Sequence, residues 1–185
     1  MCLSQYLRCF WQRNALVFVF SIHTLTSVYQ DIGRHLTLGE IIWATKEVPK
    51  TNLFSYTNPD FPFINHHWLG EVLLYLGSLA VGLKGLIVLK SFLITSAFAF
   101  AFFAFYRRET SFLSVMAGLI SVFILIERTD VRPEIFSFLF LGWYLFALFS
   151  YQENISPPKP WRRRILWSLP FIQFLWVNTH IYFFL

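Results

Sequence analysis

Long apolar stretches separated by short polar segments dominate the chain. Five apolar runs cover about residues 15–29, 84–106, 111–126, 135–151 and 165–185. Most of them come close to the roughly 20 residues that cross the hydrocarbon core of a bilayer as a helix. The runs are continuous rather than alternating, which argues against a membrane β-barrel. The pattern therefore predicts an all-α fold, a polytopic transmembrane helical bundle of about five spans.

The longest polar interval runs from Asp31 to Glu71 and holds three prolines and three histidines. Its first part, residues 31–45, has apolar positions at helical spacing, which predicts an amphipathic helix lying in the membrane interface. The positions on that face are Ile32, Leu36, Gly39 and Trp43. Residues 46–62 are predicted to be an extended loop, because they contain the turn signal Asn58-Pro59-Asp60.

Residues 68–83 are apolar enough to cross a membrane but carry Glu71 near their start and three glycines. The positive-inside rule favours an interfacial position, because the leader, Arg107-Arg108 and Arg162–Arg164 then all face the cytoplasm. The prediction is one transmembrane domain: residues 1–30 form a leader and first span, 31–83 an external loop with two interfacial helices, and 84–185 four further spans. Because the chain ends inside an apolar run, we expect an N-terminal portion of a longer protein.

Composition supports the membrane class, since 56% of the residues are hydrophobic and 23 of the 185 are Phe. The net charge of +5 comes with basic clusters that flank the apolar runs, so it is interpreted as a topology signal and not as a nucleic-acid surface. Membrane lipids are thus expected partners. The first run could also be a signal peptide, but no small-x-small cleavage site follows it, which favours an uncleaved signal anchor.

Asp31 lies where the first span meets the outer interface. Partial desolvation there would favour a role as general base, while the alternative is an ordinary helix N-cap. His35, one turn later, could orient Asp31 or contact a phosphate, or it could be a solvated interfacial histidine. Glu71 could be a second carboxylate of the same site, or a charge that snorkels at a helix start.

His66 and His67 are adjacent and point to different faces, so they lack the spacing of a helical metal pair. A site made of Asp31, His35 and His66 has no spacing signature either. No cofactor is therefore predicted, with a divalent metal kept as an alternative.

Three further polar residues lie in or beside apolar runs. Lys90 is within a span, which makes it a functional candidate unless it snorkels to the interface. Arg132 could neutralise a phosphate or pair with neighbouring acids. His180 lies in an aromatic run and must be satisfied by protein or by a cavity. No nucleotide-binding loop, GxSxG or HExxH motif is present, so soluble-nucleotide chemistry is not supported.

Several segments together resemble a known family. They are Asp31 with the helix that follows it, the FSYT loop, NHHWLGEVLLY at residues 65–75, Arg132-Pro133 followed by IFSFLF, and LWVNTH ending at His180. These resemble the first external loop and following spans of bacterial membrane glycosyltransferases of the GT-C fold, in the branch related to protein O-mannosyltransferases and RgtA/B/C/D-like enzymes. The resemblance covers nearly the whole chain, and only the N-terminal portion of such enzymes.

The resemblance implies an inverting transfer of sugar from a polyprenyl-phosphate donor to a hydroxyl of an acceptor glycan, lipid or protein. The reaction would occur on the outer side of a bacterial plasma (inner) membrane, with the N-terminus cytoplasmic. Asp31 matches the family's catalytic acid, and Lys90 matches a basic position early in the next span. Where many relatives have a second acid beside the first, this chain has Gln30 and Ile32, which argues against a metal-dependent version.

The expected site therefore has Asp31 as catalytic base, and the candidates for binding the donor phosphate or the acceptor are His35, His66, His67, Glu71, Lys90, Arg132 and His180. The alternative function is a non-catalytic multi-spanning membrane protein, either a transporter-like subunit or a degenerate GT-C scaffold. A transporter is expected to show paired broken helices or an internal repeat, and neither is clear in the sequence.

Overall fold

A computed structural model of the chain describes residues 14–22, 31–58, 60–105, 116–118, 120–121, 130–152 and 160–181. These residues are mostly helical, which confirms the all-α prediction for this part of the chain. Residues 14–22 are helical, and the longer helices are α2 (Ile32–Thr45), α3 (Trp68–Phe105), α5 (Glu134–Gln152), α6 (Pro160–Leu166) and α7 (Ser168–Thr179).

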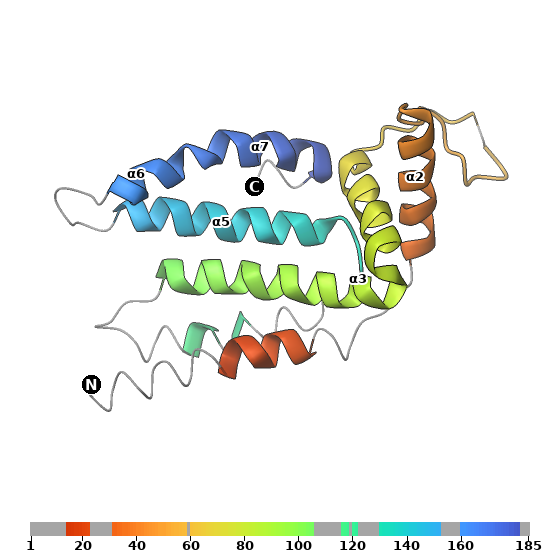
Figure 1. The fold of residues 1–185 in the computed structure, drawn as a ribbon. Coiled ribbons are helices and arrows are strands. Elements are labelled where there is room, and N and C mark those ends of the chain that lie inside the picture. The colour runs from red at the N-terminus through yellow and green to blue at the C-terminus, as the bar shows by residue number, and fades with distance from the viewer. Residues whose placement is uncertain are drawn as a thin grey trace, which may run out of the picture.

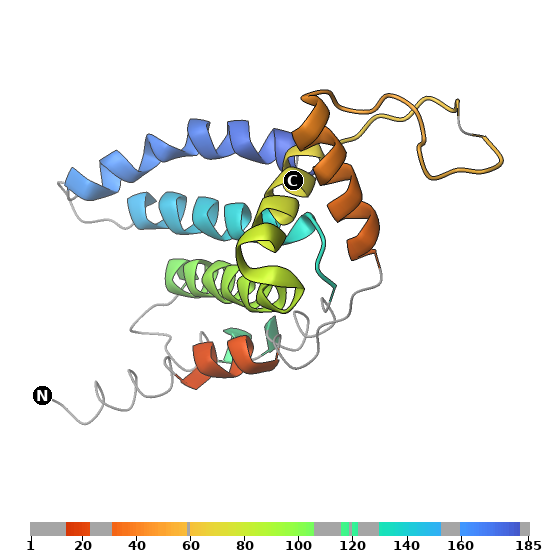
Figure 2. The same ribbon diagram turned by 45° about the vertical axis from the view of Figure 1, so that its right-hand side comes forward.

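Helix α3 has two parts that run in different directions. Gly82 interrupts the helical backbone with φ 71° and ψ 175°, a conformation that glycine adopts without a Cβ penalty. We call residues 68–81 the short arm and residues 83–105 the long arm. Figures 1 and 2 show the long arm beside α5 and the short arm crossing the end of this layer next to α2. The break therefore lies within two residues of the boundary predicted between the segments 68–83 and 84–106.

Helix α2 packs against the short arm through a narrow stripe. Its buried residues are Ile32, His35, Leu38, Gly39 and Ile42. The helix is confirmed, and the predicted face is right at Ile32 and Gly39 but wrong at Trp43, which is 46% exposed; His35 takes an inner position. Gly39 makes the approach possible: a Cβ there would lie against the carbonyl oxygen of Glu71 and 2.8 Å from Tyr75 Cβ. The helix ends at Lys46, whose left-handed backbone directs its N–H to the Ile42 carbonyl at 2.9 Å.

The loop after α2 folds back as a short hairpin that projects from the helical layers (Figure 1). Thr51 and Pro62 form an isolated antiparallel bridge, and the Phe63 N–H donates to the Lys50 carbonyl at 2.8 Å. The Asn52 N–H likewise donates to the Phe61 carbonyl at 3.1 Å. The extended loop is therefore confirmed for the residues described there, and Pro59 lies outside them.

Helix α5 lies between the long arm and α7 (Figure 1). Gly142 lets it approach α3 closely, since a Cβ there would be 2.6 Å from the carbonyl oxygen of Ala97. On its other side, Trp176 of α7 donates its indole N–H to Ser137 Oγ at 2.9 Å. Helices α6 and α7 are separate, with Trp167 between them. Pro170 lacks the N–H that would bond to the Leu166 carbonyl, which explains a break at this point.

Two of the described helices are long and apolar enough to cross a membrane: Trp68–Phe105 and Glu134–Tyr151. In their most apolar windows only 17% and 22% of the residues are buried inside the molecule, whereas the core helix of a soluble protein would be mostly buried. Exposed Val88, Phe92 and Leu141 suit contact with lipid. These helices support a membrane protein, but the predicted total of five spans is not confirmed.

Several predicted features fall on residues outside the described ranges. The leader, Arg107-Arg108 and the loop at 153–159 belong to this group, as does most of the predicted run at 111–126. The cytoplasmic position of the basic clusters therefore stays a prediction. Of the predicted last run, α6 and α7 are each shorter than a full span.

Candidate functional site

Asp31 occupies the N-cap position of α2, yet its side chain makes no capping hydrogen bond. Its Oδ2 atom instead lies 2.9 Å from Arg132 Nη2. The same Nη2 atom lies 2.9 Å from Asp130 Oδ2, so one guanidinium group holds two carboxylates. We call these three residues the Arg132 cluster. The Asp31 side chain is 48% exposed and that of Arg132 38%, which leaves the cluster open to a ligand.

Close packing of the segment before α5 against the short arm places Arg132. A Cβ at Gly70 would lie 2.9 Å from Pro133 Cβ and 2.8 Å from the carbonyl oxygen of Thr179. Gly70 therefore brings the start of α3, the residue after Arg132 and the end of α7 together. Pro133 directly precedes α5, which begins at Glu134, and a proline suits this position because its missing N–H is not needed at a helix start.

Lys90 is fully buried in the long arm, as is its neighbour Ser91. The snorkelling alternative is therefore wrong for this lysine. Asp130, of the Arg132 cluster, is the charged group that acts on it electrostatically. A buried cation beside this cluster partly offsets the excess of carboxylates there.

A second polar group lies inside the junction of α2 and the short arm. His35 Nδ1–H donates to Glu71 Oε1 at 3.0 Å, and Asn65 Nδ2–H donates to Glu71 Oε2 at 2.6 Å. Because both donors are side chains on separate segments, they tie α2, the loop and α3 together. We call His35, Asn65 and Glu71 the Glu71 network, and all three side chains are buried. Asn65 also accepts from the backbone N–H of His67 at 2.9 Å.

The Glu71 network corrects two predictions. Glu71 is 2% exposed, so it is not a charge that snorkels to the surface. His35 is neither solvated nor placed to orient Asp31, because its Nδ1 faces Glu71. Asn65 was not among the predicted site residues. The sequence contains a local signal for Asn65, because it lies six residues before Glu71, the acid in the first turn of α3.

His67 lies between His35 and His180. Its ring centroid is 4.7 Å from that of His180, in an edge-to-face arrangement, and 6.4 Å from that of His35. Burial lowers the pKa of His67; Glu71 opposes this, while the charges of His35, His66 and Arg34 add to it. His66 is exposed, so the prediction that the adjacent histidines face different ways is confirmed.

His180 follows the last residue of α7 and is buried. Burial lowers its pKa to about 4, with further lowering from His67 and His35. The residue two positions earlier also meets the start of α3, because Trp68 Nε1–H donates to Asn178 Oδ1 at 3.3 Å. These contacts meet the prediction that the polar residues of this run need partners from the protein.

The described residues contain no group of three or more His, Cys, Asp or Glu side chains that could hold a metal ion. The alternative metal site of Asp31, His35 and His66 is not formed in the structure. Asp31 pairs with Arg132, His35 pairs with Glu71, and His66 lies on the surface.

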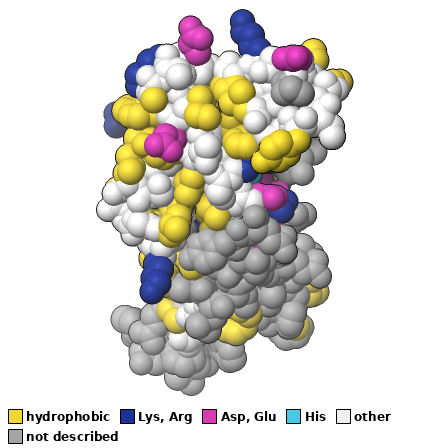
Figure 3. All heavy atoms as spheres, turned by 90° about the vertical axis from the view of Figure 1, so that its right-hand side faces the viewer, with side chains coloured by type: hydrophobic (Ala, Val, Ile, Leu, Met, Phe, Trp, Pro, Cys, Tyr) yellow, Lys and Arg dark blue, Asp and Glu magenta, His cyan; other side chains and the backbone are white. Residues whose placement is uncertain are grey.

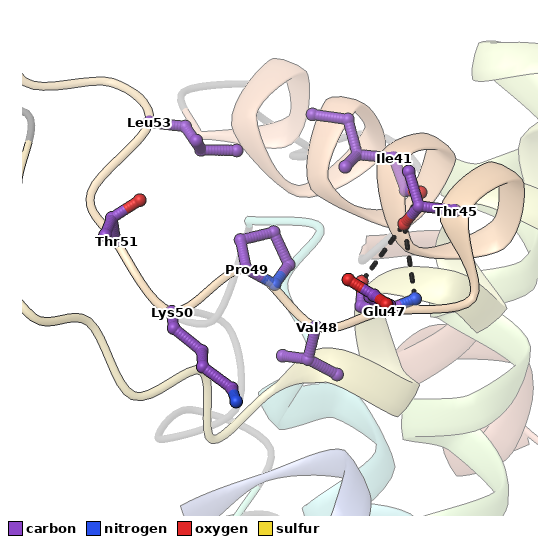
Figure 4. Close-up of a pocket in the computed structure, with 8 residues that line it drawn as sticks. All are labelled: Ile41, Thr45, Glu47, Val48, Pro49, Lys50, Thr51 and Leu53. Atoms are coloured by element: carbon purple, nitrogen blue, oxygen red, sulfur yellow. Dashed lines mark hydrogen bonds between the residues drawn. The ribbon is translucent and has the colours of Figure 1, made fainter.

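An open groove lies at the opposite end of α2 from Asp31, between the helix and the hairpin (Figure 4). In it, the Glu47 N–H donates to Thr45 Oγ1 at 3.2 Å. The residues that line it are Ile41, Thr45, Glu47, Val48, Pro49, Lys50, Thr51 and Leu53. Since α2 has 14 residues, about 20 Å separate this groove from Asp31, too far for one small ligand to touch both. Figure 3 shows apolar and charged side chains mixed over this end of the molecule.

Comparisons of the chain with protein-family models, with curated proteins and with solved structures found no match.

Proposed function

We propose that the chain carries the donor and base site of a membrane glycosyltransferase that moves a sugar from a polyprenyl-phosphate donor to an acceptor hydroxyl. The observation that carries this proposal is the Arg132 cluster. It combines a half-exposed carboxylate with a partly exposed guanidinium group, at the point where α2 begins. A carboxylate can take a proton from a hydroxyl, and a guanidinium can bind a phosphate.

The reaction assigns one role to each side chain. Asp31 takes the proton of the acceptor hydroxyl, whose oxygen attacks the anomeric carbon of the sugar. The bond between that carbon and the phosphate oxygen breaks, and its electron pair leaves with the lipid phosphate. Arg132 and Lys90 stabilise the negative charge that grows on the phosphate. The nucleophile and the leaving group lie on opposite faces of the carbon, so the configuration inverts.

The arrangement of the helices supports a donor that comes from the bilayer. In the proposal the long arm of α3 and α5 cross the plasma membrane of a bacterium, while α2 and the short arm lie in its outer interface. An apolar cavity between α3, α5 and residues 117, 118 and 121 lies further along the same spans and suits a lipid chain. Its lining includes Phe98, Phe102, Gly118, Phe138 and Gly142. His66 stays an acceptor-contact candidate because its side chain is exposed beside the short arm.

The proposal is tested with Asp31→Asn, which keeps the size of the side chain but removes the proton acceptor. We expect sugar transfer in membranes supplied with a polyprenyl-phosphate sugar to fall by about 100-fold or more, the usual contribution of a general base. Membrane insertion and yield should stay unchanged. Asp60→Asn, which removes an exposed acid in the hairpin, is the matched control and should keep full activity. Wild-type transfer by Asp31→Asn would refute the role of base.

A non-catalytic scaffold is the second candidate, and the ion pair between Asp31 and Arg132 favours it, since this pair also joins α2 to the segment before α5. The charge exchange Asp31→Arg with Arg132→Asp separates the two functions when it is made in an Asp130→Asn background, which removes the second carboxylate beside residue 132. A scaffold needs only the attraction, so in that background the exchange should restore the thermal stability that either single change loses, and any cellular role with it. A glycosyltransferase should recover stability without transfer.

A further inference from the structure

Arg132 uses one nitrogen for two carboxylates. Nη2 lies 2.9 Å from Asp31 Oδ2 and 2.9 Å from Asp130 Oδ2, and these acids come from the start of α2 and from the segment before α5. Two carboxylates against one guanidinium leave one unit of excess negative charge in the cluster itself. The Arg132 Nε atom is buried and makes no hydrogen bond. The donor capacity of this side chain is therefore only partly used.

The ion pair has a consequence for a base. Asp31 Oδ2 points its lone pair at Arg132, so that oxygen is not available to an acceptor hydroxyl in the structure as it stands. A guanidinium group prefers an anion that can take two parallel hydrogen bonds, as a phosphate does. Both side chains are partly exposed, so a phosphate can approach Arg132 without passing through the protein interior.

We propose that the donor phosphate displaces Asp31 from Arg132, so that the base is released only when the donor is bound. This inference rests on the proposed function and deepens it, because it assigns an order in which the donor binds before the acceptor reacts. While the donor is absent, Arg132 holds Asp31 through its Oδ2 atom. Once the phosphate binds Arg132, the Asp31 carboxylate is free to accept the proton of the acceptor hydroxyl. Asp130 keeps its contact and holds the arginine in place.

The exchange also fits the charge changes of the reaction. The donor is a phosphodiester with one negative charge, and the product is a lipid phosphate monoester with up to two. Arg132 therefore binds the phosphate more strongly as the bond to the sugar breaks. When the lipid phosphate leaves, Asp31 gives its proton to water and pairs with Arg132 again.

The test measures binding without turnover, using the full chain in detergent and farnesyl phosphate as the probe. If Asp31 competes for Arg132, Asp31→Asn should bind the probe more tightly, with a Kd about two- to five-fold lower, as expected for loss of a partly exposed ion pair. The gain must act through the arginine. In an Arg132→Gln background, where binding is weaker, Asp31→Asn should therefore produce no further change.

Three results would overturn the proposed displacement of Asp31. Two are an unchanged or a higher Kd for farnesyl phosphate in Asp31→Asn. The third is an equal fall in Kd when Asp31→Asn is made in the Arg132→Gln background, which would show a general charge effect. These results leave the proposed function standing if wild-type protein binds the probe and Asp31→Asn abolishes transfer. Failure of the wild type to bind farnesyl phosphate overturns both. Inorganic phosphate at the same concentration should not displace the probe; equal competition would exclude a lipid ligand and with it the proposal.

Discussion

Asp31 and Glu71 are two carboxylates at the starts of two helices that pack together, and the structure gives them opposite surroundings. Asp31 is 48% exposed and pairs with a charged group, Arg132. Glu71 is 2% exposed and accepts hydrogen bonds from His35 and Asn65. An exposed acid with a displaceable partner is suited to react, whereas a buried acid with two side-chain donors holds segments in register. The difference indicates that Asp31 belongs to the candidate site, whereas Glu71 belongs to the buried network that holds the helices together.

The largest effect on stability is expected from Glu71→Ala. This change leaves His35 Nδ1 and Asn65 Nδ2 buried without their acceptor, and removing one member of such a buried group costs about 3–5 kcal/mol. The melting temperature in detergent should fall strongly. Glu71→Gln, which keeps one acceptor oxygen, should lose less.

The melting temperature of Asp31→Asn, measured under the same conditions, tests the difference between the two acids. Because exposed ion pairs contribute about 0–1 kcal/mol, this variant should melt close to the wild type. Equal losses in the Asp31 and Glu71 variants would show that the two acids are not distinguished as the structure indicates.

A smaller effect is expected from Gly39→Ala, which acts on the Glu71 network through the backbone. The new Cβ would press on the carbonyl oxygen of Glu71, so α2 and the short arm must move apart. Overpacking of this kind costs about 1–3 kcal/mol. Gly33→Ala is the matched control in the same helix, because a Cβ there has open space within 4 Å and alanine favours a helix by up to about 1 kcal/mol. Thermal unfolding of both variants tests this, and similar melting temperatures would contradict the close approach.

Periodicity and apolar run lengths predicted the helix after Asp31, the extended loop, the division of α3 near Gly82 and an apolar helix from about residue 135, close to the observed start of α5 at Glu134. These features depend on neighbouring residues, on glycine at an unusual backbone angle and on proline at a first turn. The sequence could not predict the inner face of α2, because that face includes His35, a polar residue. Its burial is explained only by an acceptor 36 positions away.

The same limit applies to the candidate site. Asp31 and Glu71 give one signal in the sequence, an acid at a helix start, and Asp31 could have been a cap and Glu71 a charge that snorkels to the surface. Their partners in the folded chain distinguish them: Arg132 pairs with Asp31, whereas His35 and Asn65 donate hydrogen bonds to Glu71. Candidate residues could thus be selected from the chain, but their partners required the packing of Gly39 and Gly70 against neighbouring segments.

The smallest effect is expected from pH and concerns the histidines beside the Glu71 network. His180 has a pKa of about 4 in the folded chain, below the ordinary 6.5, because it is buried and faces His67 and His35. Between these two pH values the unfolded chain binds more protons than the folded chain at this site, so stability falls as pH drops through that window and is unaffected by His180 above it. From pH 7 to 5.5 the loss from His180 should be about 1 kcal/mol.

His180→Phe keeps a ring of similar shape against His67 and removes the titrating group, so its melting temperature should fall less between pH 7 and 5.5 than that of the wild type. The ionisable neighbours are the same in both proteins, so the difference between the two slopes, and not either slope, measures the effect. These neighbours are Glu71, His35, His66, His67 and Arg34. His66→Phe replaces an exposed ring and should keep the wild-type slope. If His180→Phe also kept the wild-type slope, a neutral histidine would not hold the end of α7 against the Glu71 network. The end of α7 would then give no support to the contrast between the buried Glu71 network and the open site at Asp31.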